Sequence, residues 1–419
     1  MLEKFWKVEE LPYTQSHIDE DKIAKTLFQT TTRILDSGRY QVEMPLRQLE
    51  NKKLGSSFVT AKQRFLRLEK KFGNDQNFYN EYKKVIEEYL TLQHAKVIPL
   101  NLYDNVTNKI KYFIPHRAVI REQATSTKLR IVYDFSAKST SGYSLNDLTL
   151  KGYQVQDNLF DILCRFRTFK FILTADIKMM YREIEMSPKH RYLQNILWRD
   201  SPSEDFKCIE LSRLSFGQNC SPFLATRVIK DIAQNNPQFP LAASALLYQT
   251  YMDDILGGTD RFSELEVLYG ELSQILNQHG FSLHKWSSNS LRFLNKISDQ
   301  NAVELDLNLD DAPCKILGLK WDSKTDHLKI DVNNATKLDR ITKRQILSCI
   351  SSCFDPLGLV NPLIVKGKLL MQELWQMKVS WDEPIIILRI IDQWEKFNEN
   401  LAQIAHIKIP RFVFFDFLA

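Results

Sequence analysis

Two adjacent carboxylates, Asp253 and Asp254, stand between short apolar runs in a pattern that predicts the tip of a β-hairpin. A third carboxylate, Asp176, comes at the end of the apolar segment 171–177, which predicts a buried strand. Adjacent acids in a tight turn usually mark a solvated loop, but apolar flanks place these acids against a core, where unpaired charge is costly. Three such carboxylates supply hard oxygen ligands, which suit Mg²⁺ or Mn²⁺ and not Zn²⁺. The chemistry they could support is phosphoryl transfer at a two-metal site, with a solvated turn as the alternative.

The elements that must position these acids change in type along the chain. Residues 1–93 repeat apolar side chains at helical spacing, and segments 111–120 and 128–135 predict a β-hairpin. From Thr336 onward two helices are expected, split by the Pro and Gly of segment 354–358. Further strands are expected in segments 171–177, 193–198, 207–211, 245–251 and 314–321, and further helices in segments 221–232 and 264–278. This order predicts an α+β protein with helices at both ends.

The composition is that of an ordinary globular protein. The chain has 419 residues, of which 44% are hydrophobic and 26% charged, so a disordered or low-complexity protein is excluded. A net charge of +5 permits a nucleic-acid partner without demanding one. The six cysteines predict reduced thiols, and no signal segment precedes the first helix. The longest apolar run is far short of the ~20 residues of a membrane span, so we expect an intracellular protein that is neither secreted nor membrane-bound.

Three motifs stand in the order of the palm motifs of reverse transcriptases. They are Asp176 followed five residues later by Tyr181, the segment 214–222 (LSFGQNCSP), and the segment 251–254 (YMDD). Asp176 and the first acid of the last motif are 77 residues apart, which is typical of that family. The wider pattern resembles the reverse transcriptase region of the Pol polyprotein of BEL/Pao LTR retrotransposons, in segments 129–138, 144–147, 194–199, 354–359 and 381–384.

This resemblance implies a right-hand polymerase, with fingers, palm and thumb, preceded by a helical N-terminal extension. RNase H activity is expected to lie outside the chain, because relatives continue into that domain where this sequence stops. The boundaries expected are 1–93 for the helical extension, 94–165 and 185–212 for the fingers, 166–184 and 213–322 for the palm, 323–384 for the thumb, and 385–419 for the start of a truncated connection segment.

The resemblance also assigns the catalytic centre. Asp176, Asp253 and Asp254 would be the catalytic residues and would hold two Mg²⁺ ions, with Mn²⁺ as the alternative metal. Tyr181 matches the steric gate, whose ring blocks a ribose 2′-OH and so selects deoxynucleotides. On spacing alone, Tyr181 suits a core aromatic side chain better, and only the family resemblance favours the steric gate.

The other candidate contacts come from several segments. Arg130 matches the fingers arginine that contacts the incoming nucleotide, and Arg121 is a candidate contact to its triphosphate. Lys285 resembles a palm lysine that donates a proton to pyrophosphate, with an ordinary surface lysine as the alternative. By the same resemblance, the floor of the nucleotide pocket is lined by Phe216, Gly217 and Gln218, and primer or template is held by Tyr251, Met252, Leu317 and Gly318.

Two basic segments suit a nucleic-acid partner. Segment 111–130 has a net charge of +4, and segment 315–378, in the expected thumb, a net charge of +5. Such runs are usually solvated faces, but near a polymerase site they can bind triphosphate and duplex phosphates independently of base sequence. The partners implied are an RNA or DNA template with its primer and dNTPs, and the resemblance admits a dimer or other Pol and Gag products. The expected location is a cytoplasmic retroelement particle.

Two rival interpretations deserve comparison. The triplet at 36–38 (Asp-Ser-Gly) resembles the active site of retroviral aspartic proteases, but Arg39 follows where a small residue is needed, so a polar turn is expected. The stronger rival is a decayed or domesticated, catalytically inactive retroelement fragment that still binds nucleic acid. Three intact carboxylates together with Tyr181 and Gly217 favour an active polymerase. The apolar run 412–419, with no further domain to bury it, favours the inactive fragment.

Overall fold

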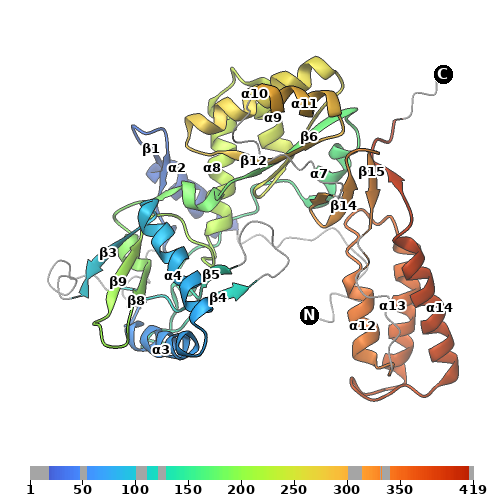
Figure 1. Cartoon of the computed structure of the whole chain (residues 1–419), viewed down its shortest axis with the longest axis horizontal. Coiled ribbons are helices and arrows are strands. Elements are labelled where there is room, and N and C mark those ends of the chain that lie inside the picture. Colours follow the sequence, from blue (N-terminus) through green and yellow to red (C-terminus); the bar gives the residue numbers. More distant parts are fainter. Residues whose placement is uncertain are drawn as a thin grey trace. The chain divides into compact units, whose positions relative to one another are not determined.

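A computed structural model of the chain describes residues 18–47, 54–100, 111–120, 129–300, 314–330, 332 and 340–414 (Figure 1). Two compact units are distinguished, and each is described by itself. The first unit comprises 1–155, 179–231 and 278–281, and the second comprises 156–178, 232–277 and 282–419. Both units mix helices and strands, as the sequence predicts. Within the described ranges, no helix is long and apolar enough to cross a membrane.

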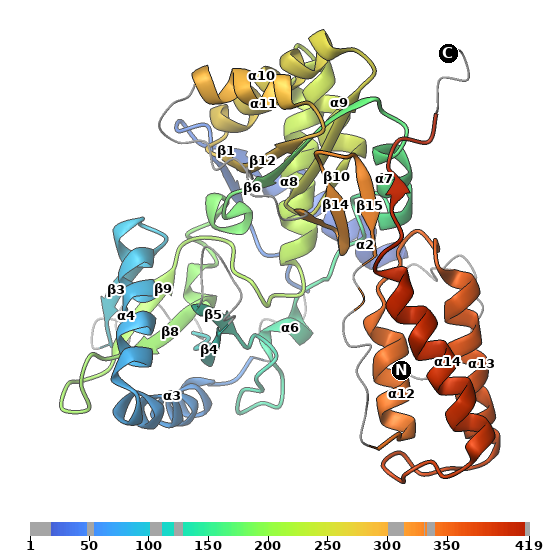
Figure 2. The same cartoon turned by 45° about the vertical axis from the view of Figure 1, so that its right-hand side comes forward.

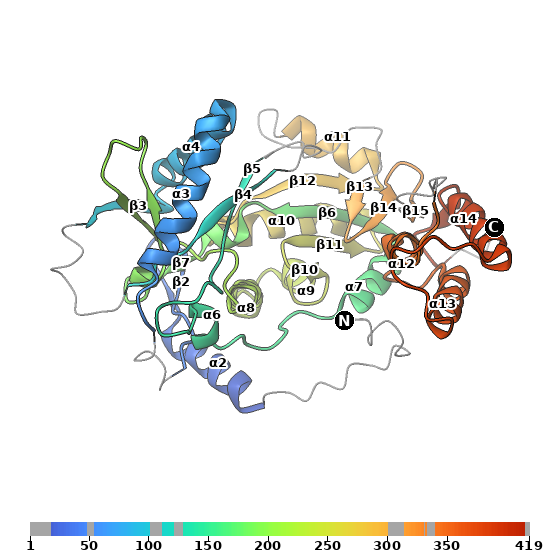
Figure 3. The ribbon, with the colours of Figure 1, turned by 90° about the horizontal axis from the view of Figure 1, so that it is seen from below.

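The second unit contains an antiparallel four-stranded sheet, which we name the carboxylate sheet. Its order is β10-β11-β6-β12, and Figure 3 shows these strands in a row. The expected strand at 171–177 is confirmed, and it is buried because it lies between β11 and β12. The strands are β10 (Thr250–Tyr251), β11 (Asp254–Thr259), β6 (Phe171–Ile177) and β12 (Leu283–Ser288). The helices next to them in sequence are α7 (Leu159–Phe166), α9 (Pro240–Tyr248), α10 (Phe262–Gln278) and α11 (Leu291–Gln300).

A second antiparallel sheet of this unit, the hairpin sheet, shares a core with the first. Its strands, in spatial order, are β13 (Cys314–Ile316), β14 (Leu319–Asp322), β15 (His327–Lys329) and β16 (Ile409–Pro410). One cluster of buried side chains joins Trp321 and Leu328 of this sheet to Phe166 of α7, Ile172 of β6 and Leu256 of β11. Burying each such side chain contributes about 1.5–3 kcal/mol, so apolar packing fixes the two sheets against each other.

A three-helix bundle follows the hairpin sheet in the chain. It consists of α12 (Lys343–Ser352), α13 (Asn361–Gln376) and α14 (Leu388–Ile404), which Figure 2 shows side by side. Thr342 begins α12 with a reciprocal capping box. The first two helices and the break between them are as expected, but α14 lies where the sequence predicted the start of a connection segment. Its residues Ile390, Trp394 and Phe397 are buried at helical spacing, which completes the bundle.

The first unit joins the N-terminal helices to three small sheets. The expected helical character of segment 1–93 is confirmed for α3 and α4, and the expected hairpin is confirmed as β4 paired with β5. Tyr82 of α4 stacks on Trp198 of β8 at 5.8 Å between ring centroids, so these helices belong to the core of the first unit. The helices are α2 (Ile18–Thr31), α3 (Phe58–Asn74) and α4 (Gln76–Thr91). The first sheet consists of β1 (Arg33–Ile34), β2 (Tyr40–Val42) and β7 (Glu185–Met186), and the second of β3 (Ala95–Pro99), β9 (Lys207–Leu211) and β8 (Asn195–Trp198). The third sheet consists of β4 (His116–Ile120) and β5 (Leu129–Tyr133).

One sequence expectation is corrected by the fold, and a second is met where the structure describes it. Most of the expected strand 245–251 is helical, because Pro240 begins α9 at its first turn and an Ala- and Leu-rich run continues it. The apolar run from 412 onward was expected to have nothing to bury it. Its residues Val413 and Phe414 are 39% and 60% exposed, in line with that expectation, although the Val413 backbone N–H donates to the Arg167 carbonyl at 3.1 Å.

Candidate active site

The carboxylate sheet brings two of the three candidate acids face to face. Asp254 begins β11 directly opposite Asp176 of β6. Directly opposed residues of antiparallel strands project to the same side of the sheet, so these two side chains are neighbours. Asp253 lies one residue earlier in the hairpin turn, where its carbonyl accepts from the Ile177 backbone N–H at 2.8 Å. The backbone therefore pairs Asp176 with Asp254 at the end of β6 and places Asp253 in the adjoining turn.

The electrostatics of this cluster are those of crowded negative charge. Burial, together with the neighbouring charges of Asp253 and Asp176 and against the opposing effect of Lys285, raises the pKa of Asp254 to about 7. Lys285 places Nζ 3.2 Å from Asp176 Oδ2, and His284 places Nε2 3.4 Å from Asp176 Oδ1. The cluster therefore attracts cations, and Lys285 is the cation paired with Asp176.

The donor set suits a hard divalent cation. Carboxylate oxygens are the ligands that Mg²⁺ and Mn²⁺ prefer, and the Lys285 ammonium is a cation that this cluster already binds. In the part of the chain that the structure describes, no group of three or more His, Cys, Asp or Glu side chains lies close enough together to hold a metal ion. Asp176 and Asp254 are thus the pair that the sheet prearranges, and Asp253 is the exposed third acid.

The turn that carries Asp253 has a strained backbone and is hydrogen-bonded to a side chain outside the hairpin. Tyr251 pairs with Asp254, so Met252 and Asp253 form a two-residue hairpin turn. Met252 has φ +56°, a conformation that favours glycine and costs about 1–3 kcal/mol for other residues. The Gln156 side chain accepts a hydrogen bond from the Met252 backbone N–H at 2.8 Å. Surrounding contacts therefore fix this turn, as at many functional sites.

The hairpin sheet provides a second tight turn. Leu317 and Gly318, between β13 and β14, both have positive φ, at +48° and +90°. A Cβ atom at Gly318 would lie 2.3 Å from the ring of Phe354, so only glycine fits. The two residues expected to hold the primer thus form the tip of a closely packed hairpin.

The expected nucleotide-pocket residues lie in the first unit. Tyr181 sits in a short 3₁₀ helix (Met180–Glu183), is 8% exposed, and contacts the ring of Phe216 at 4.6 Å between centroids. Phe216 is 45% exposed. A Cβ atom at Gly217, where φ is +94°, would lie 2.4 Å from the Tyr133 carbonyl oxygen. Tyr181 is therefore nearly as buried as a core residue, and its ring packs against the half-exposed ring of Phe216.

Gln218 differs from its two neighbours in this loop. Its side chain is buried, and its amide donates to the Gln194 side chain. Asn146 supports the same loop, donating to the Gly217 carbonyl at 3.0 Å and accepting from the Asn219 backbone N–H at 2.9 Å. Gln218 accordingly stabilises the loop from within.

The hairpin of β4 and β5 carries the expected nucleotide-contacting arginine. Arg130 is exposed on β5 and pairs with Val119, and one pair separates it from the pair formed by Arg117 and Val132. Alternate pairs share a face, so Arg117 and Arg130 project to the same side. Arg121 lies outside the described residues.

A basic groove of about 740 Å³ lies between this hairpin and α3. Its cationic lining is Arg64, Arg67 and Lys71 of α3 and Arg117 of β4. Arg64 pairs with Asp134 at 2.7 Å, whereas the other three cations make no ion pair with any described carboxylate. The α3 cations were not predicted from the sequence, although their i, i+3, i+7 spacing is a signal for one helix face.

Comparisons with known proteins bear on both units. A family model described as reverse transcriptase (RNA-dependent DNA polymerase) matches residues 118–320, a range that contains every candidate site residue. A model described as Pao retrotransposon-like RNaseH-like domain matches residues 342–417. The comparison with curated proteins gives no match. The second match corrects the expectation that the chain stops short of RNase H-related sequence, and the described residues of that match form α12–α14 and β16.

Proposed function

We propose, from the premise that the chain belongs to the reverse transcriptases of BEL/Pao retrotransposons, that the carboxylate sheet is the centre at which the primer is extended. The protein is by family an RNA-directed DNA polymerase. The observation that carries the assignment of the centre is the register pair of Asp176 and Asp254, whose crowding favours a bound cation. A template with its primer and dNTPs are the corresponding substrates.

Asp176, Asp253 and Asp254 are proposed to hold two Mg²⁺ ions. When bound, the ions activate the primer 3′-OH and stabilise the pyrophosphate that leaves. The carboxylates act by position and charge and not as nucleophiles, which is typical of phosphoryl transfer. Lys285, with Nζ 3.2 Å from Asp176 Oδ2, is the proposed proton donor to the leaving pyrophosphate. In this assignment the Lys285 ammonium would donate to the leaving group instead of to Asp176.

The nucleotide pocket is proposed to use the first unit. Tyr181 would act as the steric gate, with Phe216 holding its ring at an angle of 50°. Gly217 would let the loop backbone approach closely, and Arg130 would contact the incoming nucleotide. Gln218, being buried, would support this loop without touching the nucleotide.

The template is proposed to run along the basic groove. Arg64, Arg67 and Lys71 span about 10 Å of helix α3, because each residue rises 1.5 Å along the axis. Cations at this spacing can meet successive phosphates of one strand without reading its bases. In this assignment α3, which was expected in the helical extension, joins β4 and β5 in the fingers. The carboxylate and hairpin sheets form the palm, and α14, which was expected in the connection segment, joins α12 and α13 in the thumb of a right-hand polymerase. The enzyme would work inside a cytoplasmic retroelement particle with other Pol and Gag products.

The test is primer extension with purified protein. We expect Mg²⁺-dependent dTTP incorporation on poly(rA)–oligo(dT), lost on Asp176→Asn or Asp253→Asn and retained on Asp205→Asn, which changes an exposed carboxylate of the first unit. The inactive-fragment alternative predicts no incorporation by the wild type under Mg²⁺ or Mn²⁺, together with retention of the duplex in a gel-shift assay. That outcome would replace the catalytic assignment.

A further inference from the structure

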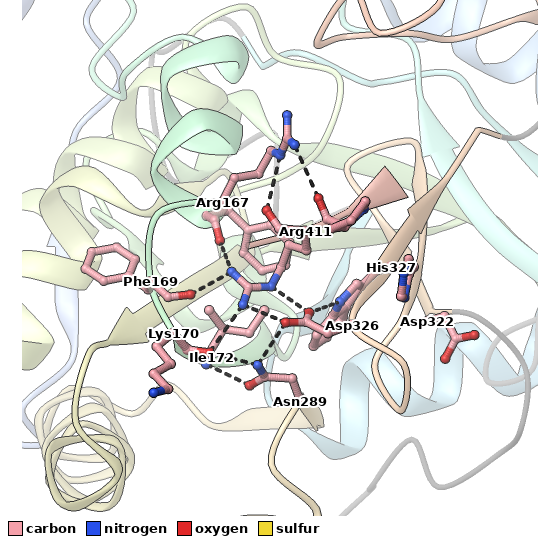
Figure 4. Close-up of polar contacts among 12 residues, drawn as sticks. Arg167, Phe169, Lys170, Ile172, Asn289, Asp322, Asp326, His327 and Arg411 are labelled. Carbon is pink, nitrogen blue, oxygen red and sulfur yellow. Dashed lines mark hydrogen bonds and ion pairs between the residues drawn. The ribbon is translucent and has the colours of Figure 1, made fainter. Parts of the chain in front are cut away.

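Arg411 is a fully buried cation with every donor used (Figure 4). Its Nε and Nη2 atoms bind the two carboxylate oxygens of Asp326 at 2.7 and 2.8 Å. Its Nη1 donates to the Phe166 and Phe169 carbonyls at 2.6 and 2.8 Å, and Nη2 also donates to the Lys170 carbonyl at 3.3 Å. A guanidinium has five N–H groups, and these five contacts account for all of them. Lysine, with three donors on one atom, could not reproduce this pattern.

These contacts connect two parts of the proposed active site. Asp326 lies in the turn between β14 and β15, so it belongs to the hairpin sheet. The three carbonyls belong to the turn between α7 and β6, the strand that ends at Asp176. Arg411 itself follows β16, and Figure 4 shows its guanidinium between these two turns.

Neighbouring groups hold both sides of this contact in place. Asp326 has φ +54° and also accepts from Trp321 Nε1 and Asn289 Nδ2, each at 3.0 Å. Asn289 donates to the Lys170 carbonyl at 2.9 Å and accepts from the Ile172 backbone N–H at 3.1 Å. The Arg167 guanidinium in turn donates to the Arg411 carbonyl at 3.2 Å. The cluster therefore fixes both turns at backbone level.

We propose that Arg411 is a positioning residue that sets the height of the β13–β14 hairpin over the strand of Asp176, and thereby the position of the primer end. This proposal rests on the proposed function, in which the tip at Leu317 and Gly318 holds the primer. Asp326 and that tip lie at opposite ends of β14, a four-residue strand about 13 Å long. A shift of the Asp326 turn is transmitted along the strand to the tip. A displacement near 1 Å at reacting groups can cost about 10²-fold in rate.

The assignment gives the C-terminal segment a role in polymerisation. Arg411 lies outside the range matched by the reverse transcriptase family and inside the range matched by the RNaseH-like family. Its contacts, however, are all with the carboxylate-sheet turn and the hairpin sheet, so the strand that carries it serves the polymerase centre.

The matched control for Arg411 is a second bidentate arginine–carboxylate pair. Arg199 binds Glu69 in the first unit with two bonds of 2.7 Å, and the side chains are 14% and 15% exposed. Arg199→Lys therefore weakens a half-buried ion pair far from the hairpin in sequence, as Arg411→Lys weakens the buried one. Both variants are expected to lower the melting temperature.

The experiment compares single-turnover dTTP addition per active site, with active sites counted by burst amplitude so that misfolded protein does not contribute. We expect Arg411→Lys to lower the rate at saturating dTTP by about tenfold or more while template–primer Kd changes less than twofold. Arg199→Lys should leave the rate per active site unchanged. An unchanged rate for Arg411→Lys would show a structural role only and would overturn the proposal.

A second measurement works without catalysis. Hydrogen exchange of the β13–β14 amides should speed up in Arg411→Lys and in the milder Asp326→Asn, but not in Arg199→Lys. If Arg411→Lys does not fold, Asp326→Asn decides through both assays. If the wild type incorporates no nucleotide but the β13–β14 amides still exchange faster in Arg411→Lys and Asp326→Asn, the proposed function is rejected and the role of the Arg411 contact in holding the hairpin is kept. Equal exchange in all variants would reject the contact's role.

Discussion

Replacing Asp254 by Asn should stabilise the metal-free protein at neutral and alkaline pH. The change removes a carboxylate that burial, Asp253 and Asp176 keep from ionising easily, with a pKa of about 7 against an ordinary value of 3.8. In the folded state this group therefore binds a proton more tightly than in the unfolded state. The free energy of unfolding falls as pH rises from about 4 to about 7 and is constant above that, because only there is the folded carboxylate fully charged.

The size of the effect follows from the shift in pKa. One pKa unit corresponds to about 1.4 kcal/mol, so a shift of roughly three units costs the metal-free fold up to about 4 kcal/mol at pH 8. Asp254→Asn should recover about 2–4 kcal/mol of that cost at pH 8 and almost none near pH 4. Mg²⁺ should offset most of this gain, because a ligand present at 100 times its Kd stabilises the wild type by about 2.7 kcal/mol, whereas the variant has lost one of the carboxylates proposed to bind it.

The assay is urea unfolding followed by tryptophan fluorescence, with EDTA or with Mg²⁺, at several pH values. Asp205→Asn is the control, since it removes an exposed carboxylate of the same type. Two results would refute the reasoning. One is an Asp254→Asn protein that is less stable than wild type at pH 8 in EDTA, and the other is a gain of equal size at pH 5 and pH 8.

Three further predictions concern the first unit. Gly217→Ala should lower the free energy of unfolding by about 2 kcal/mol or more, because the added Cβ would meet a carbonyl oxygen. Gly142→Ala, also at positive φ but in open space, should cost less, and equal losses of stability in thermal melts would contradict this. The double change Arg67→Ala with Lys71→Ala should weaken template–primer binding, and in fluorescence anisotropy it should reduce the slope of log K against log salt by about 1.5. An unchanged slope would show that the template does not run along the groove. Tyr181→Ala should admit ribonucleotides in primer extension, while unchanged sugar discrimination would end the steric-gate assignment.

Local patterns in the sequence predicted the elements that carry the acids. Strand β6 is where an unbroken apolar run indicated it, and the hairpin turn at Asp253 was visible from two acids between apolar segments. The helix α9 was missed because an apolar run of this length suits a strand and a helix equally, and Pro240 decides between them. Family resemblance, and not spacing, singled out Tyr181 and Lys285.

Contacts between distant segments could not be predicted from the sequence. Arg411 meets Phe166 across 245 residues, and nothing near Arg411 in the chain indicates a buried partner. The same holds for the basic groove, where Arg67 and Arg117 come from a helix and a strand with different periodicities. Such sites arise from tertiary packing, so a single sequence shows the residues of each segment but not which distant segments come into contact.

The late return of β16 has a consequence for how the chain folds during synthesis. Leu328 of β15 pairs with Ile409, and the whole helical bundle is made between them. Until residue 409 leaves the ribosome, β15 presents an open sheet edge, and such edges template aggregation. Pairings of this high contact order also form slowly. Folding of the hairpin sheet should therefore be completed only after translation of the bundle, and chains ending before β16 should aggregate more readily than chains that include Arg411.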